Sequence, residues 1–251
     1  RARVLQEALD GPLVHGLGDP AVHEGLDLCL ACKGCSSDCP TGVDMATLKA
    51  EVLQHSYAGR RRPRSHRVLG GLPRWLALTA WAAPLRSRLA TSRVTSGLVK
   101  AVAGVDRRRT LPVPAPHPLR TSSELAAGAT SSDDVPEVWL WADTFTTGFR
   151  PEAAEAAIRV LADAGLRARV IPERACCGLT WTTTGQLDTA RRVLGDAVAT
   201  LAPYVASGVP VLGLEPSCLA TLRSDAVELS DDPRAAEVGA GVLTLAELWE
   251  L

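Results

Sequence analysis

The sequence lacks the features by which secreted, membrane-spanning and dinucleotide-binding proteins are recognised. It has neither a signal peptide nor an apolar run long enough to cross a membrane. No dinucleotide-binding or FAD-binding motif and no obvious internal repeat occurs between residues 1 and 251. Together with the seven cysteines, an odd number, these absences predict a reduced, cytoplasmic setting. Without a dinucleotide-binding or FAD-binding motif, no residue of this chain can be assigned to flavin chemistry.

Acidic residues are nearly missing from the middle of the chain. Between Val52 and Ser123, fourteen Lys and Arg residues accompany a single acid, Asp106, although the formal net charge of the whole chain is -1. The composition predicts a basic, proline-rich helical connector over residues 58–134, ending in a flexible linker over residues 121–134. Its charges and apolar side chains suit either an anionic membrane surface, met peripherally on its inner face, or a solvated connector. No recognition motif supports binding to nucleic acid.

The N-terminal part of the chain has the pattern of short helices around a group of cysteines. Asp19 followed by Pro20 is typical of a helix start, and Asp44 can cap a second helix after the cysteines. Residues 1–57 are therefore predicted to form a helical, ferredoxin-like domain. The chain begins at Arg1 inside a helical pattern that has no N-cap, so we expect it to be a piece of a longer protein.

The C-terminal part alternates short apolar runs with helical patterns. Strands are predicted at residues 138–141, 168–171 and 209–214, and helices at 151–164 and 186–206. This alternation predicts an α/β domain with a parallel sheet over residues 135–251, which we expect to be incomplete, and an α+β fold overall. Ligands bind such sheets at the carboxyl ends of the strands, where three further cysteines fall, namely Cys176, Cys177 and Cys218.

A run of four cysteines is the strongest chemical signal in the sequence. Cys29, Cys32, Cys35 and Cys39, followed by Pro40, have the spacing C-x2-C-x2-C-x3-C-P of a bacterial ferredoxin loop for a [4Fe–4S] cluster. The alternative, a structural zinc site, normally uses two C-x2-C pairs about fifteen residues apart. The spacing therefore predicts that these four thiolates bind a [4Fe–4S] cluster.

The fourth cysteine of the run has two possible roles. In two-cluster ferredoxins, the fourth cysteine of each run binds the neighbouring cluster. Only one such run is present here. Either Cys39 completes the local cluster, or its partner run lies upstream of Arg1.

The adjacent cysteines Cys176 and Cys177, followed by Gly178, resemble the cysteine-rich "CCG" domain of heterodisulfide reductase. In that domain the motif lies between a lone cysteine and a C-x2-C pair. Here Asp143-Thr144 stands near the first position, and Glu215 replaces the first cysteine of the pair that ends in Cys218. The resemblance implies a second metal site at Cys176, Cys177, Cys218 and Glu215, with two expected ligands missing. The alternative is that these cysteines are small buried apolar side chains.

Most of the chain resembles the large FAD-linked oxidases with a fused iron–sulfur region, of the D-lactate dehydrogenase and glycolate oxidase type. The resemblance is carried by LDLCLACKGCSSDCPTGVDMATLKAE, RRRPRSHRVLG and CCGLTWTTTGQLDTARRVL. It implies an oxidoreductase in which an FAD-binding domain or subunit oxidises a 2-hydroxy acid, and this chain passes the electrons through its cluster to a quinone or cytochrome. The fragment alone would transfer electrons without a catalytic residue of its own. Two other functions remain open: thiol or disulfide chemistry at the CCG motif, and a scaffold held together by a cluster without redox activity.

Overall fold

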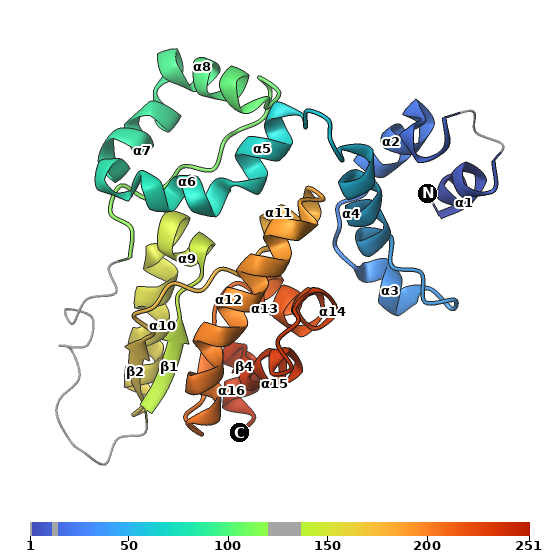
Figure 1. Cartoon of the computed structure of the whole chain (residues 1–251). Helices are drawn as coiled ribbons and strands as arrows, with labels where there is room; N and C mark the ends of the chain where they lie inside the picture. The colour runs from blue at the N-terminus through green and yellow to red at the C-terminus, as the bar shows by residue number, and fades with distance from the viewer. Residues whose placement is uncertain (1, 12–14, 120–136) are drawn as a thin grey trace.

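The structure is a computed structural model, and it describes residues 2–11, 15–119 and 137–251 (Figure 1). The linker predicted over residues 121–134 lies outside these ranges. The described chain is mostly helical, with a small parallel sheet in its C-terminal part. This confirms the predicted α+β fold with a C-terminal α/β unit.

Short helices surround the cysteine run near the N-terminus. As predicted, the Asp19 carboxylate accepts a hydrogen bond from the Ala21 amide at 2.9 Å, and Asp44 accepts one from the Ala46 amide at 2.8 Å. A small core of Leu5, Leu26 and other apolar residues holds these helices together. The elements are α1 (Ala2–Leu9), η1 (Gly16–Gly18), α2 (Pro20–Asp27), α3 (Gly34–Asp38) and α4 (Met45–Ser56).

The basic middle stretch forms a series of helices, as predicted. They are α5 (Arg64–Gly70), α6 (Leu72–Leu78), η2 (Ala80–Ala82), α7 (Ala83–Thr91) and α8 (Arg93–Ala103). Trp75 and Trp81 on this stretch are 51% and 86% exposed. Its contact with an anionic membrane surface stays a prediction. None of the described helices combines the length and the apolarity needed to cross a membrane.

The C-terminal unit is built on parallel strands in the order β2-β1-β3-β4. Three of these strands match the predicted positions. The fourth, β4, was not predicted because two residues are too few to show a pattern. The strands are β1 (Glu137–Trp141), β2 (Arg167–Val170), β3 (Val211–Gly213) and β4 (Val242–Leu243).

Helices cover both faces of this sheet. On one face, Leu140 and Leu212 pack with residues of α10 and α16. On the other face, Trp141 and Val211 pack with residues of α12, α13 and α15. Successive strand residues thus serve opposite cores, as expected for a sheet buried on both sides. The helices are α9 (Thr144–Phe149), α10 (Pro151–Asp163), α11 (Leu179–Thr183), α12 (Leu187–Ala206), α13 (Pro216–Arg223), α14 (Asp225–Leu229), α15 (Ala235–Gly241) and α16 (Leu245–Trp249).

The turn between α11 and α12 packs directly against α4 and the start of the basic stretch (Figure 1). The guanidinium of Arg62 donates hydrogen bonds to the carbonyls of Thr184 at 2.9 Å and Gly185 at 2.6 Å. Gly185 has a φ of +64°, and a Cβ atom built there would lie 2.4 Å from the Leu53 Cβ atom. Only glycine fits this turn without strain or displacement, because it needs left-handed backbone and has no room for a side chain.

Candidate functional site

The cysteine run forms a loop between α2 and α4. Cys29 follows α2, Cys35 lies within the short helix α3, and Cys39 ends that helix. Ala31 and Lys33 have φ angles of +53° and +58°, which is uncommon for residues with a side chain. The loop is thus tightly wound around its cysteines, and α3, a helix of five residues, was not predicted from the sequence.

Hydrogen bonds reach three of the four sulfur atoms of this loop. The amide of Ala31 donates to the Cys29 Sγ at 3.4 Å, and the amide of Met45 donates to the Cys35 Sγ at 3.2 Å. The Thr41 hydroxyl lies 3.1 Å from the Cys39 Sγ. This hydroxyl, followed by backbone amides, lowers the pKa of the Cys39 thiol below its usual value. These contacts therefore favour the thiolate of Cys39, the form that binds metal.

The donor set of the loop fits an iron–sulfur cluster in its chemistry. All four cysteines are free thiols, and backbone N–H groups are directed at sulfur, as cluster-binding loops require. Among the described residues, however, no three His, Cys, Asp or Glu side chains stand in an arrangement that could hold a metal ion. The four thiols thus lie on one loop but do not come together in an arrangement that could hold a metal ion. Leu28 and Leu30, on either side of Cys29, are 67% and 88% exposed.

Lys33, in the middle of the cysteine run, fastens the loop to the C-terminal unit. Its Nζ atom lies 2.9 Å from the Asp225 carboxylate at the start of α14 and 3.2 Å from the Ser224 hydroxyl. Burial alone would lower the pKa of Lys33, but the hydrogen bond and the charge of Asp225 outweigh it and raise that pKa. Lys33 is therefore charged at neutral pH, and its contact with Ser224 joins residues 191 positions apart in the chain. No sequence pattern indicated this contact.

The three remaining cysteines lie together at the carboxyl end of the sheet, as predicted. Cys176 and Cys177 follow β2, and Cys218 lies in α13 after β3. The Sγ atoms of Cys177 and Cys218 are 2.8 Å apart, and both side chains are buried. The strand order reverses around β1, so these cysteines lie at the point where such sheets usually bind ligands.

The environment of these cysteines keeps them protonated. The hydrogen bond with Cys177 and burial raise the pKa of Cys176. At Cys177, the neighbouring Cys176 lowers the pKa, but contact with Cys218 and burial outweigh this effect and raise it. At Cys218, Cys177 likewise lowers the pKa, and burial with the nearby charge of Asp143 raises it. Because metals bind thiolates, this group is a poorer ligand set than the N-terminal loop.

Both positions where the CCG pattern lacks a cysteine are helix starts. The carboxylate of Asp143, 1% exposed, accepts hydrogen bonds from the amides of Phe145 at 2.7 Å and Thr146 at 3.1 Å and so caps α9. Glu215 accepts from the Ser217 amide at 3.4 Å and caps α13. Glu215 therefore has a capping role in this structure, and its proposed metal ligation stays a prediction. Burial raises the pKa of Asp143.

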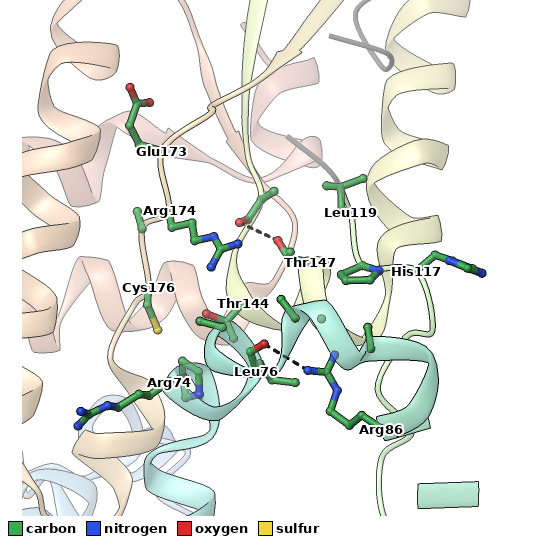
Figure 2. Close-up of a pocket in the computed structure, with 18 of the residues that line it drawn as sticks. Arg74, Leu76, Arg86, His117, Leu119, Thr144, Thr147, Glu173, Arg174 and Cys176 are labelled. Atoms are coloured by element: carbon green, nitrogen blue, oxygen red, sulfur yellow. Dashed lines mark hydrogen bonds between the residues drawn. The ribbon is translucent and has the colours of Figure 1, made fainter. Parts of the chain in front are cut away.

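A cavity of about 800 Å³ adjoins Cys176, and sequence reasoning missed it. Its walls come from α6 and α7, from residues 116–119, and from the chain that follows β1 and β2 (Figure 2). These segments are far apart in the sequence. The prolines of the run APHPL at positions 115–119 indicate an extended segment, but they do not indicate which residues lie on the other side of the cavity.

Comparison with known proteins gives one distant similarity and two negative results. No protein-family model matches the chain, and no solved structure matches it. The chain is 21% identical over 220 residues to a D-2-hydroxyglutarate dehydrogenase from Pantoea ananatis (strain AJ13355), an alignment that covers 85% of this chain. It spans about a fifth of that relative's length (21%). That relative is named for the dehydrogenation of a 2-hydroxy acid, the kind of substrate that the resemblance in the cysteine motifs implies.

Proposed function

We propose that the chain is the iron–sulfur electron-transfer module of a larger, FAD-linked oxidoreductase acting on a 2-hydroxy acid. The observation that carries the proposal is the loop of Cys29, Cys32, Cys35 and Cys39, in which hydrogen bonds are directed at sulfur and the pKa of Cys39 is lowered. The distant similarity to a 2-hydroxyglutarate dehydrogenase supports a 2-hydroxy acid oxidoreductase in general. In this proposal the FAD lies in a domain or subunit outside this chain, and a quinone or cytochrome accepts the electrons.

When bound, a [4Fe–4S] cluster supplies one-electron oxidation and reduction. The residues of the chain hold and tune it. Cys29, Cys32, Cys35 and Cys39 are its ligands, and the amides of Ala31 and Met45 stabilise negative charge on sulfur. Lys33 pairs with Asp225, so its charge holds the loop in place against the C-terminal unit.

We further propose that the predicted boundaries divide the chain by role. Residues 1–57 carry the cluster, residues 58–134 connect, and residues 135–251 form the α/β unit. The docking contacts of Lys33 and Arg62 support electron transfer in a fixed geometry, because they hold the first part and the start of the connector against the third part.

Reduction of the loaded protein tests the proposal directly. Anaerobic titration with dithionite is expected to bleach the visible absorbance and to produce an electron paramagnetic resonance signal of about one unpaired electron per chain. Air-free ferricyanide should restore the original spectrum. A cluster that resists reduction would favour the scaffold role. The Cys176→Ser, Cys177→Ser double variant serves as the control, and it should titrate like the wild type.

The contact between Cys177 and Cys218 favours a second candidate function, which is thiol and disulfide chemistry. Their sulfur atoms are 2.8 Å apart, farther than the roughly 2.05 Å of a disulfide bond, so a small movement would join them. The two thiols would lose two protons and two electrons to an oxidant as the S–S bond forms. Cys176, beside the cavity, would connect this pair to a substrate.

Diamide treatment of the protein is expected to link Cys177 to Cys218 first. Diamide accepts the two electrons and two protons and becomes the hydrazine. Mass spectrometry of tryptic peptides should show the 175–191 and 193–223 peptides joined. The link should persist in Cys176→Ser and disappear in Cys218→Ser. A link that is lost in Cys176→Ser would rule out the pairing seen here.

A further inference from the structure

The cavity beside Cys176 combines an apolar interior with positive charge. Leu76, Leu119, Ala175 and Trp181 line it, and these side chains are buried. Its volume of about 800 Å³ is in the range of sites that enclose a small organic ligand. The walls come from three separate parts of the described chain, so the cavity exists only in the folded protein.

Three arginines contribute to the lining of the same cavity, namely Arg74, Arg86 and Arg174, and none has a carboxylate partner in the described ranges. Figure 2 shows the guanidinium of Arg74 directed away from those of Arg86 and Arg174. The one acid in the lining, Glu173, accepts a hydrogen bond from the Tyr204 hydroxyl. Figure 2 shows the Glu173 carboxylate turned away from the guanidinium of Arg174. The described lining thus carries three arginines and one carboxylate, which is an excess of positive charge.

Arg86 has one hydrogen-bond donor that finds no acceptor among the described residues. One of its terminal nitrogens donates to the Leu76 carbonyl at 3.2 Å and to the Thr79 hydroxyl at 2.9 Å. Its Nε atom is buried and has no hydrogen-bond partner among the described residues. Buried donors are normally satisfied, so this atom has capacity for an acceptor that a ligand would supply.

These observations restrict the chemistry of a ligand. A neutral apolar molecule would fill the space but would leave the arginines unpaired, and a small inorganic anion would leave the apolar walls empty. A cation would be repelled. We propose that the cavity binds an amphipathic monocarboxylate, with its head group near Arg86 and Arg174 and its aliphatic tail against Leu76, Leu119 and Trp181. This site is separate from the cysteine loop, and ligand binding there does not require a bound cluster.

Titration calorimetry with dodecanoate tests this inference. Dodecanoate is expected to bind, while dodecanol and dodecyltrimethylammonium, which have the same tail, should bind at least tenfold more weakly. Arg174→Gln and Arg86→Gln should each weaken dodecanoate binding about threefold, and the double variant about tenfold, as expected for partly exposed ion pairs. Arg88→Gln is the matched control, because Arg88 lies on α7 outside the cavity. The affinity of this variant for dodecanoate should equal that of the wild type.

A second measurement locates the ligand. Saturating dodecanoate should change the tryptophan fluorescence of the protein, because Trp181 lines the cavity. Trp181→Phe should remove this change, and Trp249→Phe, outside the cavity, should keep it. Equal binding of dodecanol, or unchanged affinity in the double arginine variant, would overturn the proposal. So would a fluorescence change on dodecanoate binding that persists in Trp181→Phe.

Discussion

Protein prepared without oxygen is expected to be brown, with about four irons and four sulfides per chain, and Cys32→Ser is expected to lose most of both. The reason is that a cubane cluster with a missing thiolate ligand is unstable, and Cys32 is the most exposed cysteine of the loop, so its replacement does not disturb packing. Iron and sulfide analysis with visible absorbance measures the result.

The matched control for this experiment uses cysteines of the other group. Replacing Cys176 and Cys177 together by Ser should leave the iron content unchanged, because those thiols are protonated and two expected ligands of that site are replaced by Thr144 and Glu215. A loss of about half the iron in this variant would establish a second cluster. Colourless wild-type protein that contains one zinc would contradict the iron–sulfur assignment.

Gly185→Ala is expected to lower the free energy of unfolding by about 3 kcal/mol. Alanine with a positive φ costs about 1–2 kcal/mol, and forcing a methyl group into a packed contact costs about 1–3 kcal/mol more. The new Cβ atom would meet the Leu53 Cβ at 2.4 Å and the Ala50 carbonyl oxygen at 2.8 Å. Urea denaturation followed by circular dichroism gives the change.

Gly208→Ala separates the two contributions to this effect. Gly208 has a φ of +77°, but a Cβ atom there meets nothing within 4 Å. Its replacement should cost only the backbone strain, about 1–2 kcal/mol. If both variants lose the same stability, the tight packing of α4 against the turn at Gly185 is not present in solution.

Local signals in the sequence predicted the longer elements of the fold. Asp19 with Pro20, and Asp44, identified helix starts because a capping carboxylate acts within three residues of its own position. The alternation of apolar runs with helical patterns predicted the parallel sheet, because this signal too comes from residues close together in the chain. The strand β4 and the short helices α3, α9, α11, α13, α14, α15 and α16 were not predicted, since segments of two to eight residues are too short to show a clear period.

The candidate sites were predicted only as far as chain neighbours determine them. The spacing from Cys29 to Cys39 placed four thiols on one loop, and strand ends placed Cys177 and Cys218 on one edge of the sheet. The 2.8 Å contact between the last two, the ion pair of Lys33 with Asp225, and the cavity all join distant segments. Such contacts depend on the packing of whole elements, which a single sequence does not reveal.

The ion pair of Lys33 with Asp225 also bears on how the cysteine loop would take up a cluster in the proposed role. Lys33 lies between Cys32 and Cys35, so the loop is tethered at its centre on the side that faces α14. Leu30 is 88% exposed and Cys32 is exposed as well, so this part of the loop is open to solvent. In the proposed role, a cluster would enter the loop past these two residues.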